Sequence, residues 1–565
     1  MAASLFDRIR TPFWLARLVG LVGGVTLVSA VLPSIRERTE IITGLIPAVF
    51  PAAAATGSAA AGLVLIVVSR ALRRGKHRAW LVATVLAAVA TILHIVKGLD
   101  YEEATLTFLL FLLLLTAGPQ FTAKPDPRSS GRVISVLVLG TLVATVLGWL
   151  WLAVDADGEA PGTTTAQRIS QAFLGLVGIT GPVRFTDGGD GDRAAIALVV
   201  LGASVLGLAI FVALAPADGP HVLSAEEEEH LRALLDRWGD IDSLSYFATR
   251  DDRSVIFSQT GKAAITYRVV GSVSLAAGDP LGDPEAWPGA LAAWLAEAKS
   301  FGWVPAVLAA SERGAEAYHR VGLDALELGD EAILHVADFS LEGRSMRGVR
   351  QAVSRCARAG LTVSTHRIAD LDEATLAVLR DRVEAWRDGT VERGFSMALG
   401  RFGDRADGQA VVALCRDSEG EPRGLLHFVP WGAEGLSLDL MRRDRDAENG
   451  IVEQMVATLM SEASTLGVRR VSLNFAVFRS VFARGERLGA GPVLRIWRST
   501  LLWASRFWQI ESLYRANAKY QPEWVPRFVC FRSSADLPRV SVAALRAEAF
   551  IVAPRWVQRR FVRSS

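Results

Sequence analysis

The feature that most constrains this chain is a series of long apolar segments in its first 216 residues. A helix that crosses a bilayer needs about 20 mostly apolar residues. Six segments reach that length, at about 13–33, 48–69, 79–97, 104–122, 133–154 and 194–215. The sequence therefore predicts a domain of six transmembrane helices over residues 1–216. With 565 residues in total, the chain is expected to carry a second part of different character.

The short connections between these segments predict their orientation, because Lys and Arg favour the cytoplasmic side. Arg8 and Arg10 precede the first segment, and basic residues fill the connections at 70–78 and 124–132. All three belong on one face, which puts the N-terminus and everything after residue 216 in the cytoplasm of a multi-pass plasma-membrane protein. The segments hold almost no charged residues, His94 being the main polar exception, which disfavours an ion-coupled transporter.

The second part has the pattern of an α/β fold. From Ser224, an expected helix N-cap followed by four glutamates, short strands alternate with amphipathic helices. The order of elements repeats from about residue 361. The sequence predicts two similar modules, at 217–360 and 361–540, with a basic tail at 541–565.

A basic helix is predicted between the two modules, in "EGRSMRGVRQAVSRCARAG". At 100° per residue, four arginines fall within about 80° of arc, and apolar residues cover the opposite side. The four are Arg344, Arg347, Arg355 and Arg358. Acids that would pair with them are missing from the helix, so we interpret the row as a site for phosphates of tRNA or anionic lipid. A solvated helix face is the alternative.

A second candidate site lies in "LSLDLMRRDRDAENG". Alternating leucines mark a half-buried strand, and Asp439, Arg442 and Arg443 come at its end, before a helix that opens near Asn449. Such strand ends commonly bind ligands in α/β folds. Asn474, in the next strand, is either a hydrogen-bonded core residue or a binding group.

Composition limits the other chemistry. The three cysteines are far apart and the eight histidines form no HExxH pattern, so we predict no metal site. The formal charge of +2 means that a polyanionic partner must be met by a local patch.

Several segments of the chain resemble those of a known protein family. "ADFSLEGRSMRGVRQAVSR", "LSLDLMRR", "SLNFAVFR", "GAGPVLRIWR" and "QIESLYRANAKYQPEWVPRF" strongly resemble the phosphatidylglycerol aminoacyltransferases, also called multiple peptide resistance factors. The resemblance covers residues 222–540 and is closest to the branch in which some members carry a fused lysyl-tRNA synthetase. It implies six membrane helices followed by tandem GNAT-like (acetyltransferase-like) cytoplasmic modules. It also implies transfer of an amino acid, lysine being favoured, from aminoacyl-tRNA to the glycerol hydroxyl of phosphatidylglycerol.

The resemblance also suggests roles for residues. We expect Asp439 to hold the ammonium of the amino acid or to assist proton transfer, and Arg442 and Lys519 to contact phosphate or the oxyanion. The expected substrate-binding residues are Asn474, Glu511, Tyr514 and Arg527. No Gly-rich loop lies between Arg445 and Gly450, so the donor is not expected to be a CoA thioester. No cofactor is expected besides the co-substrate aminoacyl-tRNA.

Several alternatives stay open. The amino acid could be alanine, and the acceptor could be diacylglycerol. The membrane helices could flip the product, and the protein could form a homo-oligomer. A lipid flippase with a sensory cytoplasmic part is the rival of another class. A peptidoglycan-type aminoacyltransferase is disfavoured, since a soluble acceptor needs no membrane domain. Because the sequence shows no synthetase module, the tRNA is expected to be charged elsewhere.

Overall fold

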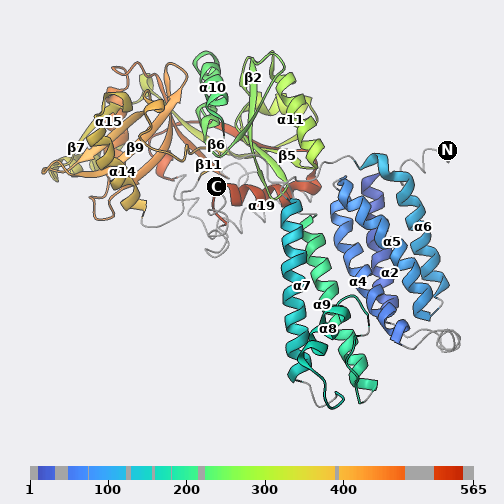
Figure 1. The fold of residues 1–565 in the computed structure, drawn as a ribbon. Helices are drawn as coiled ribbons and strands as arrows, with labels where there is room; N and C mark the ends of the chain where they lie inside the picture. Colours follow the sequence, from blue (N-terminus) through green and yellow to red (C-terminus); the bar gives the residue numbers. More distant parts are fainter. Residues whose placement is uncertain are drawn as a thin grey trace. The chain divides into compact units, whose positions relative to one another are not determined.

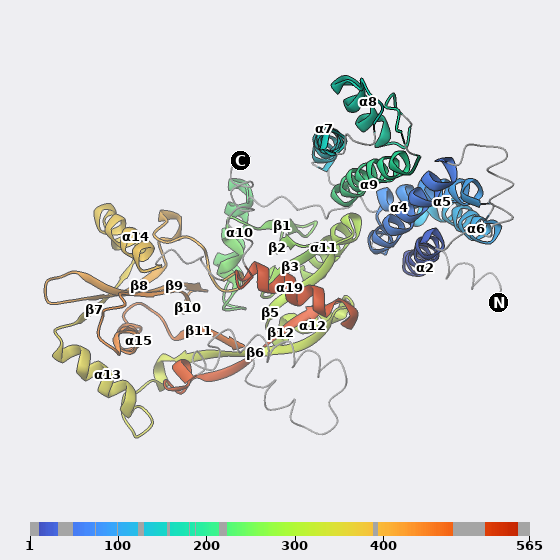
Figure 2. The same cartoon turned by 90° about the horizontal axis from the view of Figure 1, so that it is seen from below.

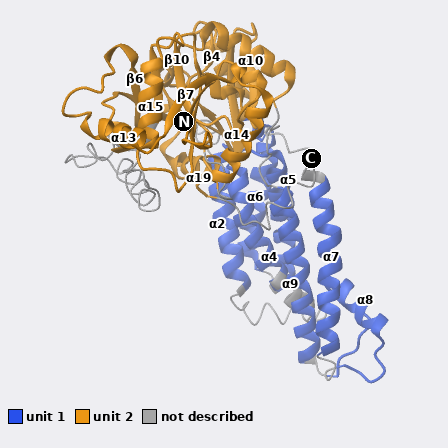
Figure 3. Cartoon of the chain, turned by 90° about the vertical axis from the view of Figure 1, so that its left-hand side faces the viewer, with its two compact units in different colours: residues 1–217, 299–303 blue, residues 218–298, 304–565 orange. Residues whose placement is uncertain are grey.

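The computed structural model describes most of the chain. The described residues are 11–31, 49–73, 75–98, 100–121, 129–154, 159–179, 181–186, 188–213, 223–387, 394–477 and 515–551. They form two compact units, one of residues 1–217 with 299–303 and one of 218–298 with 304–565 (Figure 3). Each unit is described by itself below.

Unit 1 consists of apolar helices. These are α2 (Pro12–Val31), α4 (Val49–Leu72), α5 (His77–Gly98), α6 (Tyr101–Ala117), α7 (Ser129–Val154) and α9 (Gly188–Ala213), with the short α8 (Thr165–Gly175). Each predicted membrane segment coincides with one long helix. Within the described residues, five helices are long and apolar enough to cross a membrane, whereas the corresponding part of α4 is shorter, at Gly57–Leu72. The predicted count of six spans is therefore approximate.

Helices α2 and α4 pack closely side by side (Figure 1). A Cβ atom added to Gly23 would lie 2.9 Å from the carbonyl oxygen of Gly62, and one added to Gly62 would lie 2.7 Å from that of Gly23. Small residues at such a crossing let two backbones approach, which is a common way to join helices in a bilayer.

Unit 2 is built on one mixed sheet. Its strands are β1 (Ser254–Phe257), β2 (Ala263–Val270), β3 (Val273–Ala277), β4 (Leu281–Gly282), β5 (Val304–Ala310), β6 (Asp324–His335), β7 (Thr362–Arg367), β8 (Val411–Arg416), β9 (Pro422–Trp431), β10 (Gly435–Arg443), β11 (Arg470–Val477) and β12 (Glu523–Phe531). The order across the sheet is β1-β2-β3-β5-β12-β6-β11-β10-β9-β8-β7, with β4 paired to β2 (Figure 2). The predicted α/β fold is confirmed.

Local turn residues explain the first strands. β1 and β2 pair antiparallel across a turn in which Gly261 has φ +69°. Gly271 and Ser272, both at positive φ, join β2 to β3. Two consecutive residues of this conformation match the twist of paired strands in a tight hairpin. The antiparallel run predicted from the sequence is therefore present.

The last strand lies far from its neighbours in sequence. The expected second module included residues 523–531, but β12 pairs antiparallel with β5 and β6, strands of the first half. β6 also pairs with β11, so the expected boundary at residue 360 divides a continuous sheet. The chain thus returns to its first half after completing the second.

Helices cover both faces of the sheet. They are α10 (Ala225–Trp238), α11 (Trp287–Phe301), α12 (Glu312–Arg320), α13 (Arg347–Arg358), α14 (Glu373–Arg387), α15 (Ile451–Glu462) and α19 (Leu537–Ala547). Figure 2 shows α14 and α15 on opposite sides of β8 and β9. Ser224 caps α10 as predicted: its hydroxyl accepts from the amide of Glu227, whose carboxylate accepts from the amide of Ser224.

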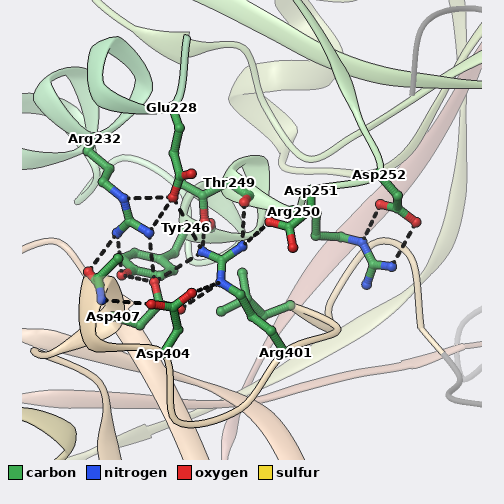
Figure 4. Close-up of polar contacts among 12 residues, drawn as sticks. Glu228, Arg232, Tyr246, Thr249, Arg250, Asp251, Asp252, Arg401, Asp404 and Asp407 are labelled. Carbon is green, nitrogen blue, oxygen red and sulfur yellow. Dashed lines mark hydrogen bonds and ion pairs between the residues drawn. The ribbon is translucent and has the colours of Figure 1, made fainter. Parts of the chain in front are cut away.

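A cluster of charged residues joins α10 to the loop before β8 (Figure 4). The carboxylate of Asp407 accepts from Arg401 Nε at 2.8 Å, from Arg232 Nη2 at 2.9 Å and from the Tyr246 hydroxyl at 2.8 Å. Arg232 also pairs with Glu228 on its own helix at 2.6 Å. Asp407 is buried between two guanidinium groups, so the cluster fixes the first half of the unit to a loop of the second half, before β8.

Candidate active site

The candidate site begins where two parallel strands part. β10 and β11 are paired from Gly435↔Arg470 to Ser437↔Ser472, and no further pair follows between them in the described residues. β10 is irregular between Leu438 and Leu440. Asn474 has φ +66°, a conformation that asparagine tolerates better than most residues, and its side-chain amide donates to the carbonyl of Leu438. Asn474 thus bridges the two strands where they diverge.

A cavity of about 440 Å³ lies beside this divergence; we call it the wedge cavity. Its walls come mainly from β10, from one side of α13, from the start of α15 and from the segment 516–520. Its charged and hydroxyl-bearing lining residues are Arg355, Arg443, Glu453, Lys519 and Tyr520. Leu438 and Leu473, on the two diverging strands, form part of its apolar wall.

The N-terminus of α15 opens into the wedge cavity. Its N-cap residue is Gly450, at φ +108°, and no side chain caps the first turn. A Cβ atom at Gly450 would lie 2.8 Å from the Cβ of Ala352 on α13, so both the conformation and the space require glycine. Uncapped amides and the helix dipole make such an end attractive to anions.

The charged side chains of the wedge cavity leave it cationic. Lys519 Nζ forms an ion pair with the Glu453 carboxylate, and both side chains are half-buried. Arg355 and Arg443 are exposed, and Arg355 Nη1 donates to the carbonyl of Asn449 at 3.2 Å. Three cations against one carboxylate suit a site that binds a phosphodiester.

Asp439 lies apart from the wedge cavity. Its carboxylate is buried, accepts from the Leu399 amide at 2.5 Å and contacts His427 Nδ1 at 2.7 Å. These partners belong to the loop before β8 and to β9. Of the three residues expected to act together, Asp439, Arg442 and Lys519, only Lys519 lines the wedge cavity. Both oxygens of Asp439 are occupied by protein groups.

The irregularity of β10 also changes which arginine lines the wedge cavity. Simple alternation would put Leu438, Leu440 and Arg442 on one face of the strand. Because the pairing shifts between Leu438 and Leu440, it is Leu438, Met441 and Arg443 that line the wedge cavity. Arg442 is half-buried, and its Nη1 donates to the carbonyl of Met441 at 3.1 Å.

Arg527 is a buried structural residue rather than a lining residue of the wedge cavity. On β12, it donates to Asp242 at 2.6 Å, to Glu331 at 2.9 Å and to the Ser243 hydroxyl at 2.5 Å. Burial alone would lower its pKa, but the negative charges of Asp242 and Glu331 raise it above the usual value. We expected Arg527 to contact substrate. In the structure it forms ion pairs that fix β12 beside β6.

The arginine row is largely as predicted. All four arginines are exposed, and none forms an ion pair with a carboxylate in the described part of the chain. The helix, however, begins at Arg347, so Arg344 lies in the turn before it. Val349, Ala352 and Cys356 face the core, as the apolar side of the helix requires.

Two predicted residues cannot be placed, and one lining residue was not predicted. Glu511 and Tyr514 lie outside the described residues. Glu453 was missed because a glutamate in the first turn of a helix is common wherever it complements the helix dipole. Its contact with Lys519 spans 66 positions of sequence, and no local pattern indicates it.

Comparison with known proteins agrees with this architecture. Residues 232–531 match the family model "Phosphatidylglycerol lysyltransferase, C-terminal", and residues 8–214 match "Transmembrane region of lysyl-tRNA synthetase". The apolar helices and the second match define a membrane protein with an attached α/β domain. The first match covers more than half of the chain, and the chain belongs to the phosphatidylglycerol lysyltransferase family.

Relatives support the same placement, and a solved structure supports the fold. The "lysylphosphatidylglycerol biosynthesis bifunctional protein LysX" of Mycobacterium avium is 43% identical over 554 residues, covering 95% of this chain and 46% of the relative. Its namesake from Rhodococcus jostii is 44% identical over 512 residues, covering 87% and 45%. The chain thus spans about half the length of the curated relatives it matches. The structure of L-PGS from Bacillus licheniformis has the same fold as 57% of this chain, with a TM-score of 0.50, 24% identity and 97% of that chain covered.

Proposed function

We propose that the chain transfers an amino acid, lysine in the first instance, from aminoacyl-tRNA to a glycerol hydroxyl of phosphatidylglycerol. The observation that carries this proposal is the cationic wedge cavity in a chain of the phosphatidylglycerol lysyltransferase family. The relatives' name, lysylphosphatidylglycerol biosynthesis, supports lysine as the amino acid.

The reaction is a transesterification. The lipid hydroxyl attacks the aminoacyl ester carbonyl, the new ester forms, and the ribose oxygen of the tRNA leaves with the proton that the hydroxyl loses. An ester is already activated, so the exchange requires no ATP and no cofactor besides aminoacyl-tRNA. Most of the acceleration then has to come from positioning two large substrates and from stabilising the oxyanion.

The wedge cavity offers a group for each charge of the substrates. Lys519, Arg443 and the N-terminus of α15 would bind the lipid phosphodiester. The carboxylate of Glu453 would hold an ammonium group of the incoming amino acid. Because ion pairs between half-exposed side chains are worth only about 1 kcal/mol or less, the ammonium can displace Lys519 from Glu453 at little cost. Lys519 would then turn to the phosphate or the oxyanion.

The arginine row would bind the tRNA backbone. It is exposed and ends beside the wedge cavity, since Arg355 belongs both to the row and to the cavity lining. Guanidinium groups without carboxylate partners are suited to phosphates. We place this site on the cytoplasmic side of the plasma membrane, as the distribution of basic residues in unit 1 predicts. A homo-oligomer and flipping of the product stay predictions.

Lipid mass spectrometry tests the proposal. A bacterium without endogenous aminoacyl lipids, expressing the full chain, should accumulate lysyl-phosphatidylglycerol, and the same cells carrying the empty vector should not. Alanyl-phosphatidylglycerol or an aminoacyl diacylglycerol in its place would identify another substrate of the same reaction. An unchanged lipid profile, with the protein present in the membrane, would contradict the proposal.

A further inference from the structure

Tyr520 combines burial with an unpaired hydroxyl in the wedge cavity. The side chain is only 4% exposed, and its hydroxyl has no hydrogen-bond partner among the described residues. The same residue lines the wedge cavity beside Lys519, whose Nζ lies 5.5 Å from the Tyr520 ring centroid.

A buried hydroxyl without a partner is costly. Such a group destabilises the folded state, because it loses its hydrogen bonds to water and gains none in the protein. Phenylalanine would fill nearly the same volume without this cost. The other buried tyrosines in the described part of unit 2 have partners for their hydroxyls: Tyr246 donates to Asp407, Tyr267 to Glu297 and Tyr318 to the carbonyl of Gly278. Tyr520 differs from them in facing a cavity large enough for a substrate.

The state of the phenol suits a hydrogen-bond donor. Burial, and next to it the negative charge of Glu453, raise the pKa of Tyr520 above its usual range, so the hydroxyl keeps its proton at neutral pH. A neutral donor in a largely buried position can stabilise negative charge that develops on a carbonyl oxygen, without a water shell that must first reorganise.

We propose that Tyr520 is a catalytic residue that donates a hydrogen bond from its hydroxyl to the carbonyl oxygen of the aminoacyl ester. This inference rests on the proposed transfer reaction and assigns the oxyanion donor within it. When the lipid hydroxyl adds to the carbonyl carbon, the oxygen gains negative charge and its hydrogen bond to Tyr520 strengthens. When the carbonyl re-forms, the ribose oxygen departs and Tyr520 still holds its proton. No proton passes through the tyrosine.

The position of Tyr520 fits this role. Glu453, in the first turn of α15, would hold the ammonium of the amino acid, and Lys519, next to Tyr520 in sequence, would contact the phosphate of the lipid. The ester carbon lies between these two groups in any complex that satisfies both. Tyr520 lines the same cavity as both of them.

The test is Tyr520→Phe in the full-length protein, reconstituted in phosphatidylglycerol vesicles and supplied with lysyl-tRNA. Loss of one oxyanion donor should lower kcat by about 100-fold, with KM for lysyl-tRNA changed less than about 3-fold. Because the variant removes an unsatisfied group, its melting temperature should equal or exceed that of the wild type. Tyr318→Phe is the matched control. It removes a paired hydroxyl from a residue that does not line the wedge cavity, so it should lower the melting temperature and leave kcat unchanged.

The outcomes are distinguishable. An active wild type with an equally active Tyr520→Phe overturns the assignment of Tyr520 and leaves the proposed function standing. A lower kcat that comes with a lower melting temperature gives Tyr520 a structural role and also overturns the assignment. A wild type that forms no aminoacyl lipid overturns the proposed function and this inference with it.

Discussion

Lys519 and Glu453 show how much the site depends on single contacts. The two side chains form an ion pair inside the wedge cavity, although 66 positions separate them in sequence. The resemblance to the aminoacyltransferases indicated Lys519, but not the acid that holds it. We infer that Lys519 and Glu453 are paired in the absence of substrate. The ammonium of the amino acid then replaces Lys519 as the partner of Glu453.

Replacing Lys519 with methionine should separate activity from stability. The lysine is half-exposed, so loss of the pair should change the free energy of unfolding by about 1 kcal/mol or less. Transfer to lipid should fall by at least about 10-fold, because the cation that contacts phosphate or oxyanion is gone. Glu453→Gln, alone and combined with Lys519→Met, completes a double-mutant cycle. Additive effects on kcat/KM would contradict a shared role for the pair.

At the scale of elements, the sequence predicted strands and helices well but missed one irregularity. The alternation of leucines in 436–440 correctly predicted β10, and the residue types after it correctly predicted α15. A shift of pairing inside a strand leaves no periodic signal, since it is set by contacts with neighbouring strands. Arg443 rather than Arg442 therefore lines the wedge cavity, and Asp439 contacts the loop before β8.

The exposed face of α13 should set the salt dependence of tRNA use. Replacing Arg344, Arg347 and Arg358 with alanine should leave folding intact, because the apolar side of the helix is untouched. Each phosphate contact contributes about 0.7–0.9 to the slope of log affinity against log salt, so the slope should fall by about 2–3. As a control, Arg320→Ala and Arg469→Ala remove exposed arginines that already pair with acids. An unchanged slope in the triple variant would favour a solvated helix face.

The cluster around Asp407 should make unit 2 sensitive to acid. Burial alone would raise the pKa of Asp407, but hydrogen bonds from Arg401 and Arg232 outweigh burial and lower it. A carboxyl with a lowered pKa stabilises the fold above its unfolded pKa of about 4, and this stability is lost as pH falls through the folded value.

Asp407→Asn should therefore cost about 3 kcal/mol at pH 7, because it removes the buried acid that two half-buried guanidinium groups share. As the pH falls from about 4 to the pH at which the protein unfolds, the free energy of unfolding should decrease less for the variant than for the wild type. Urea unfolding of both proteins at several pH values measures this. Parallel stability curves would show that Asp407 does not supply the pH dependence.

At the scale of the whole molecule, composition and periodicity predicted the division into a membrane part and an α/β part. They did not predict α19, which spans Leu537–Ala547, across the expected start of a basic tail at residue 541. They could not predict that β12 inserts between β5 and β6, because pairing between distant strands depends on contacts such as those of Arg527 with Asp242 and Glu331. For the same reason, the sequence did not predict that Arg527 lies in the core and not in the expected site. Local patterns predict elements, whereas the site is assembled from residues distant in sequence.

The central claim is that one chain takes an amino acid from tRNA and places it on a membrane lipid. The most direct measurement supplies the full-length protein, reconstituted in phosphatidylglycerol vesicles, with tRNA charged with isotope-labelled lysine, and follows the label into extracted lipid. Our account predicts labelled lysyl-phosphatidylglycerol in amounts that match the tRNA discharged, and none when free lysine and uncharged tRNA replace lysyl-tRNA. Label that stays on the tRNA, or lipid labelled equally by free lysine, would contradict it.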